Sequence, residues 1–108
     1  MLQEHYINST DLCSVDLTNK LLTLGMGSEM LYYDEEDKMY HFPLWQAQQW
    51  LREEKHINVR VNYLPDGIWF ANWLNLDTEE YDDTDCKCAT YEKALEDGIE
   101  TVLLLLDN

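Results

Sequence analysis

Residues 43–74 constrain the fold more than any other stretch of the chain. Two runs that suit β-strands, 57–63 and 68–74, flank the tripeptide Pro65-Asp66-Gly67, and a helical pattern precedes them. Proline, aspartate and glycine in this order favour a type I turn with glycine in a left-handed conformation, which makes a three-residue hairpin loop. The stretch also contains all four tryptophans of the chain. We therefore expect a helix followed by a β-hairpin at the centre of the fold.

The length of this loop decides which side chains face the core. A three-residue loop pairs Leu64 with Ile68 and places Trp69 and Trp73 on the same face as Val59, whereas a two-residue loop would turn them to the opposite face. We predict the three-residue loop and hence tryptophans in the core. The second strand is apolar on both faces, so its other face also needs a cover. Either the N-terminal segment or a second copy of the chain would cover the second-face residues, which are Leu64, Ile68, Phe70 and Leu74.

The remaining elements follow from caps and turn residues. Ser14 suits the N-cap of a helix that Gly25 ends. Strand-like runs at 30–33 and 38–42 flank four consecutive acids, and we expect a helix from 43 to about 56. A short edge strand is expected near Tyr81 or Cys86. Thr90 suits the N-cap of the last helix, and Gly98 on its apolar face indicates a close approach to the sheet.

These elements predict one α+β domain over residues 1–108. Two helix-plus-hairpin units, 14–42 and 43–76, precede a closing helix at 90–106, so the expected order is α-β-β-α-β-β-(β)-α. The natural solution is a two-layer fold. We expect an antiparallel sheet of four to five strands with the helices mainly on one face.

The net charge of the chain limits the kinds of molecule that it can bind. The net charge is -15, yet residues 43–76 carry three acids and three bases. A strongly negative chain repels nucleic acid phosphates and anionic lipids, so we expect neither direct nucleic acid binding nor membrane binding. A protein partner with a basic surface is the electrostatic complement. The candidate partner-binding residues are the two acidic runs, Asp34, Glu35, Glu36 and Asp37, and Asp77, Glu79, Glu80, Asp82, Asp83 and Asp85.

The sequence points to a bacterial cytoplasmic location. It has no apolar run of about 18 residues that would span a bilayer and no signal-peptide pattern at its start. Three cysteines, Cys13, Cys86 and Cys88, form no even disulfide framework, so we expect reduced thiols.

No motif for catalysis, metal binding or a cofactor is present, and we predict none of the three. The run at 34–37 lacks the glycine and ligand spacing of a calcium-binding loop. The histidines, His5, His41 and His56, lie in separate segments. An enzyme would need the fold to bring two of them together with a cysteine or with the acids at 77–85.

Three segments carry a resemblance to a known group of proteins. They are SVDLTNKLLTLG at 14–25, QAQQWLRE at 46–53 and TYEKALEDG at 90–98. In this order they resemble a family of small proteins of Bacteroidota and of their phages and mobile elements, to which no activity is assigned. The two acidic runs depart from that pattern, so they are where this chain's own partner preference would lie. The end of the chain is also similar, more weakly, to antitoxin domains of the HicB type.

The expected function is therefore a non-enzymatic protein-binding module, encoded by a phage or mobile element, that acts on a basic partner. It would serve as a host-defence inhibitor or a nucleic acid mimic. One alternative is an antitoxin-like regulatory module. The other is a small hydrolase or metal-dependent enzyme.

Overall fold

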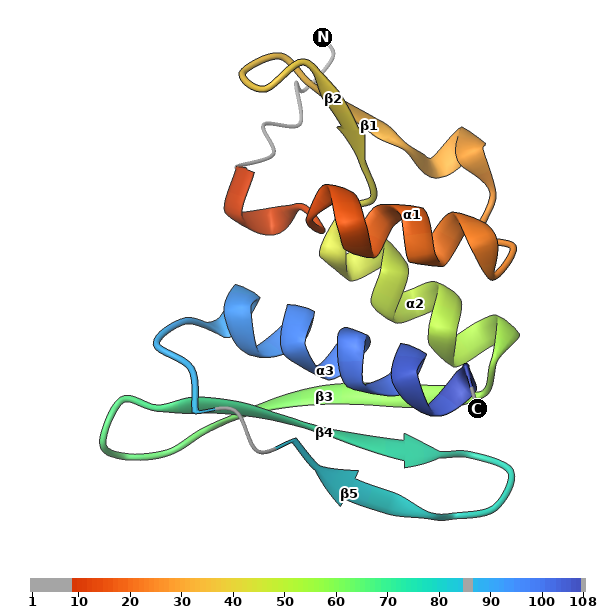
Figure 1. Ribbon diagram of the computed structural model, residues 1–108. Coiled ribbons are helices and arrows are strands. Elements are labelled where there is room, and N and C mark those ends of the chain that lie inside the picture. Colours follow the sequence, from red (N-terminus) through yellow and green to blue (C-terminus); the bar gives the residue numbers. More distant parts are fainter. Residues whose placement is uncertain (1–8, 85–86, 108) are drawn as a thin grey trace, which may run out of the picture.

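The structure is a computed structural model that describes residues 9–84 and 87–107 of the chain. Figure 1 shows three helices stacked on one side of a three-stranded sheet, with a small hairpin at the far end of the stack. The fold class is α+β, as the sequence predicts.

The three-stranded sheet is antiparallel and contains β3 (Ile57–Tyr63), β4 (Trp69–Asn75) and β5 (Tyr81–Asp83), in that order. Leu64 donates its backbone N–H to the carbonyl of Ile68 at 2.8 Å, and Gly67 has a φ of +86°. Tyr63 therefore faces Trp69 across the ladder. The three-residue loop is confirmed, and it fixes the faces of both strands as predicted.

The predicted edge strand near Tyr81 is also confirmed as β5; Cys86, the alternative position, lies outside the described residues. After β5, two further residues of the chain, Thr84 and Cys88, form backbone hydrogen bonds with β4. The backbone N–H of Thr84 donates to the carbonyl of Ala71 at 2.9 Å, and Trp69 and Cys88 exchange two backbone hydrogen bonds of 2.8 Å. Paired backbone groups along β4 stabilise it as the central strand.

Helix α3 (Tyr91–Leu106) lies across β3 and β4 and begins at the predicted N-cap, where the Thr90 hydroxyl accepts the Lys93 N–H at 3.1 Å. At Gly98 the backbone of α3 comes close to β3 and β4. A Cβ at this position would lie 2.7 Å from the Cβ of Ala71 and 2.7 Å from Cγ1 of Val59. The prediction for Gly98 is confirmed, because only a glycine lets the helix backbone sit so near the sheet.

Two further helices complete the stack. Helix α1 (Val15–Thr23) begins at the cap formed by Ser14 and ends before Gly25, whose φ is +109°. Helix α2 (Leu44–Glu54) follows Pro43, which is its N-cap residue rather than part of its first turn. Both helices are confirmed to within the usual uncertainty of helix ends. Their apolar faces form the core with α3 and the sheet, and its largest fully buried side chains are Phe42, Leu17, Leu21, Leu51, Ile99, Val59 and Val102.

The prediction of a single sheet of four to five strands is wrong. The hairpin of β1 (Tyr32–Asp34) and β2 (Met39–His41) is a separate two-stranded sheet. Two contacts explain this. The Cys13 N–H donates to the carbonyl of Phe42 at 2.8 Å just beyond β2, and the Gln48 side chain donates to the carbonyl of Val59 at 2.7 Å. The Gln48 amide therefore takes a backbone acceptor of β3 that a fourth strand would use.

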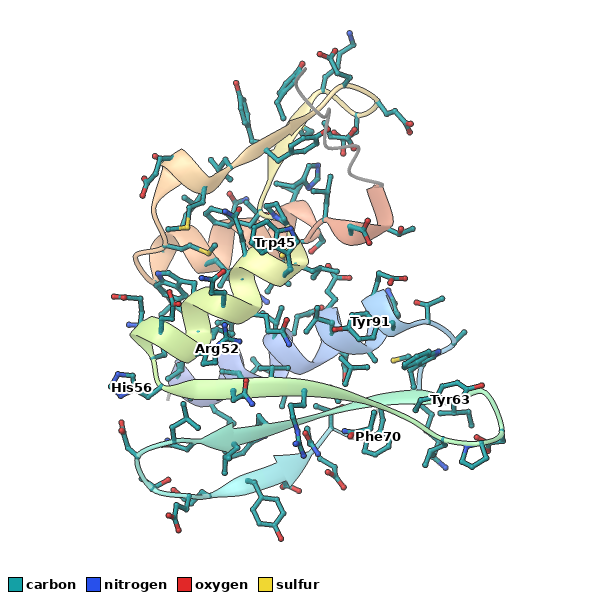
Figure 2. The ribbon with its side chains drawn as sticks, turned by 180° about the vertical axis from the view of Figure 1, so that it is seen from behind. Trp45, Arg52, His56, Tyr63, Phe70 and Tyr91 are labelled. Atoms are coloured by element: carbon teal, nitrogen blue, oxygen red, sulfur yellow. The ribbon has the colours of Figure 1, made fainter. Side chains whose placement is uncertain are left out.

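Two short 3₁₀ helices, η1 (Ser9–Asp11) and η2 (Ser28–Met30), were not predicted. The four tryptophans divide between core and surface. Trp50 is buried, Trp73 packs against the core, and Trp69 is half-buried and contacts Tyr91 of α3, whereas Trp45 is 54% exposed near the start of α2 (Figure 2). The predicted placement of Trp69 and Trp73 on the helix-packed face is therefore confirmed, and Trp45 lies outside the core.

The second-face residues lie on the side of the sheet opposite the helices, as the register requires. Leu64 and Leu74 are exposed, Ile68 and Phe70 are half-buried, and Figure 2 shows Phe70 pointing away from the helices. The chain from residue 9 to Ser14 lies on the helix side, so this part of the N-terminal segment does not cover them. A second copy of the chain as the cover stays a prediction.

Candidate functional site

A cleft of about 310 Å³ opens between the β1–β2 turn, η1 and the first half of α3. Its wall carries four carboxylates from two elements: Asp34 and Asp37 from the turn, and Glu92 and Glu96 from α3. His41 also lines it. These five residues are called the acidic cleft below. Among the described residues that line the cleft, Lys93 is the one basic side chain.

The negative charge continues along α3. Glu92, Glu96 and Glu100 follow one another at helical i, i+4 spacing, so they lie on one face about 6 Å apart along the axis. Burial, followed by the charge of Glu96, raises the pKa of Glu100, and Lys20 offsets this only in part. Lys20 is itself paired with Asp16 at 3.2 Å. Lys20 therefore offsets the negative charge on this face of α3 only in part.

The raised pKa of Glu100 has a consequence for stability. At a pH below the ordinary value of 4.5, the carboxyl is protonated in both folded and unfolded chains and contributes nothing. As the pH rises between 4.5 and the raised folded pKa, the unfolded chain releases its proton first, so stability falls. Glu100→Gln is therefore expected to stabilise the protein at about pH 7, with the gain vanishing at about pH 4.

Urea unfolding of both proteins at the two pH values measures this difference. Glu54→Gln is the matched control, because Glu54 is an exposed helical glutamate like Glu100 but belongs to α2 and not to the row of α3 carboxylates. An equal gain in both variants, or a gain for Glu100→Gln that persists at the lower pH, would contradict the argument.

His41 is held at the base of the acidic cleft by two contacts. Its Nδ1 lies 2.8 Å from the backbone carbonyl oxygen of Cys13, and its Nε2 lies 2.7 Å from Oδ2 of Asp37. The side chain is only 7% exposed. Asp37 is a member of the first acidic run, and the cleft brings it and Asp34 to a buried imidazole.

The Cys13 thiol is not prepared for nucleophilic chemistry. Burial, followed by the charge of Glu96, raises the pKa of Cys13 to about 12. The protonated thiol is a poor nucleophile and a poor metal ligand at neutral pH. His41 contacts the backbone of Cys13, and His56 lies elsewhere between α2 and β3, where Nδ1 is 3.0 Å from Oδ2 of Asp77. Within the described residues, the fold therefore does not assemble His41 and His56 with a cysteine; His5 and Cys86 lie outside them.

The two acidic runs do not form one surface. The β1–β2 turn lies at one end of the molecule and the β4–β5 turn and β5 at the other (Figure 1). Asp34 and Asp37 face the acidic cleft, while Glu35 and Glu36 are exposed on the turn. In the second run, Asp77 contacts His56 and the other described acids are exposed, namely Glu79, Glu80, Asp82 and Asp83. Asp85 lies outside the described residues.

Sequence reasoning missed Glu92, Glu96 and His41 as members of the site. The i, i+4 spacing of Glu92 and Glu96 places them on one face of the last helix but does not indicate what that face contacts. The sequence did contain a signal for His41. His41 follows Asp37 by four residues, across the end of the turn, and the two side chains are in contact. No pattern in the sequence near either segment indicates that α3 lies beside the β1–β2 turn.

Comparisons of the chain with models of protein families, with curated proteins and with solved structures found no match. Within residues 9–84 and 87–107, no helix is long and apolar enough to cross a bilayer.

Proposed function

We propose that the protein binds a basic surface of another protein through the acidic cleft and does not itself catalyse a reaction. The observation that carries the proposal is the convergence of four carboxylates from the β1–β2 turn and α3 on one cleft with a single lysine. Like charges at i, i+4 spacing oppose helix stability. An arginine or lysine from a partner would relieve that repulsion and form charge-assisted hydrogen bonds with the carboxylates.

The kind of partner follows from the same geometry. Carboxylates repeated along one helix face resemble the charge pattern of a nucleic acid backbone, so a nucleic-acid-binding protein is the expected target. In this proposal the chain belongs to a phage or mobile element, and it blocks a host protein in the bacterial cytoplasm. The long-range field of a chain with net charge -15 would speed the encounter.

A pair of charge-matched variants tests which acids matter. The cleft variant carries Asp34→Asn, Glu92→Gln and Glu96→Gln, three carboxylates that line the acidic cleft. The control variant carries Glu79→Gln, Glu80→Gln and Asp82→Asn, which removes the same charge from the second acidic run. In pull-downs from host lysate, identified by mass spectrometry, we expect the wild type and the control to retain a basic partner and the cleft variant to lose it.

Salt provides the second measurement. At about 1 M salt the Debye length is about 3 Å, so an electrostatic complex should dissociate. Equal loss of the partner in both variants would show that only net charge matters. A partner that stays bound to the wild type at this salt concentration, or that has no basic surface, would contradict the proposal.

A further inference from the structure

The orientation of His41 leaves one of its ring nitrogens aimed into the acidic cleft. The carbonyl oxygen of Cys13 can only accept a hydrogen bond, so Nδ1 carries the hydrogen in their 2.8 Å contact. In the neutral imidazole Nε2 is then a lone-pair acceptor. A histidine that donates one N–H to a backbone carbonyl and presents the other nitrogen is the usual arrangement of a metal-ligating imidazole.

Each of the two aspartates has an oxygen within 4.8 Å of a His41 ring nitrogen. One oxygen of each is held by the turn: Oδ1 of Asp34 accepts the Glu36 N–H at 3.1 Å, and Oδ1 of Asp37 accepts the Met39 N–H at 2.9 Å. A ligand atom from each of Asp34, Asp37 and His41 lies within 4.8 Å of the others. The site therefore combines two carboxylates with an imidazole that is nine-tenths buried.

The contact between Nε2 and Asp37 requires a proton or a metal ion. An ionised carboxylate only accepts hydrogen bonds, and the neutral Nε2 of this tautomer also only accepts. Two acceptors 2.7 Å apart therefore repel each other unless a proton joins them or a metal ion binds both. A proton on Nε2 would join His41 to Asp37 but would not involve Asp34. A metal ion could also bind Asp34, which the turn holds through the Glu36 N–H and whose ligand oxygen lies within 4.8 Å of the ligand atoms of Asp37 and His41.

We propose that Asp34, Asp37 and His41 bind a divalent transition-metal ion of the zinc class. Imidazole favours such ions over Mg²⁺ and Ca²⁺. Tetrahedral ligands at about 2.0 Å lie about 3.3 Å apart, so Asp37 must withdraw slightly. Its side chain is 46% exposed and free to do so. The ligand set leaves a fourth position toward the cleft, where Glu92 and Glu96 add negative potential.

The test is titration of the metal-stripped full chain with ZnCl₂ by isothermal calorimetry, repeated for two variants. Asp34→Asn keeps the turn's acceptor oxygen and leaves the His41–Asp37 pair intact, so it removes only the third ligand. Asp77→Asn is the matched control, because Asp77 forms the other histidine–aspartate pair of the described chain. We expect one Zn²⁺ per wild-type chain, at least about tenfold weaker binding by Asp34→Asn, and no change for Asp77→Asn.

Three outcomes would overturn the proposal. Absence of saturable binding by the wild type would show that a proton alone joins His41 and Asp37. Wild-type affinity in Asp34→Asn would remove the third ligand, and equal weakening in both variants would show diffuse attraction of cations to a chain of net charge -15. A Mg²⁺ titration separates the ion classes, since displacement of Zn²⁺ by equal Mg²⁺ would contradict an imidazole ligand.

Discussion

Replacing Phe42 by alanine is expected to lower the free energy of unfolding by about 3–5 kcal/mol. The Phe42 side chain is fully buried, and it is the largest such side chain among the described residues. Its backbone carbonyl accepts the Cys13 N–H, and its backbone N–H donates to the Thr18 hydroxyl oxygen at 3.2 Å. Phe42 thus joins the β1–β2 hairpin to α1, and its removal leaves a cavity between them. A small domain has only about 5–15 kcal/mol of stability to lose.

Urea unfolding measures the loss, and Trp45→Ala provides the contrast. Trp45 is also a large aromatic residue, but it is 54% exposed, so its truncation should cost less than about 1 kcal/mol. Phe42→Leu, which retains most of the volume, should fall between the two. An effect of Trp45→Ala as large as that of Phe42→Ala would contradict the placement of these residues.

Replacing Gly98 by valine is expected to cost about 3 kcal/mol, and replacing it by alanine about 1–2 kcal/mol. Alanine would gain about 1 kcal/mol of helix propensity at an unconstrained site. Here its Cβ meets the Cβ of Ala71 at 2.7 Å, and that atom is fixed to a strand backbone that cannot give way cheaply. Helix α3 would have to lift from the sheet and lose contact with it.

A double-mutant cycle isolates this contact. Ala71→Gly removes the facing Cβ and should destabilise the wild type, because it leaves a gap in a central strand. In the Gly98→Ala background the same change relieves the clash, so the two effects should not add. Simple additivity in urea unfolding, or stabilisation by Gly98→Ala alone, would show that the helix does not approach the sheet so closely.

Local chemistry was sufficient to predict most of the secondary structure. Ser14 and Thr90 were predicted as caps, and the Pro65-Asp66-Gly67 loop gave the register of β3 and β4. These signals act between residues near in sequence. The number of sheets depends on contacts between distant segments, such as Gln48 with Val59 and Cys13 with Phe42. Neither contact has a signature in the sequence, so the single sheet was a reasonable but incorrect prediction.

The candidate site shows the same division. The acids of the β1–β2 turn were identified from the sequence because four of them are consecutive. Their grouping with Glu92 and Glu96 depends on where α3 passes the turn, which the sequence does not indicate. The contact of Asp37 with His41, in contrast, joins residues only four apart in the sequence. The second acidic run has more acids, six within residues 77–85, but lies at the other end of the molecule. Charge counting alone could not choose between the two runs.

The Gln48 side chain on β3 also affects how the protein behaves at high concentration. A seven-residue strand with a bare outer edge is a template on which another chain can add its own strand, and such additions lead to filaments. The Gln48 amide occupies the Val59 carbonyl on that edge. On the opposite edge, β5 is short and carries Asp82 and Asp83, which repel an incoming copy. The two edges are thus protected from polymerisation by different means, one by a hydrogen bond and the other by charge.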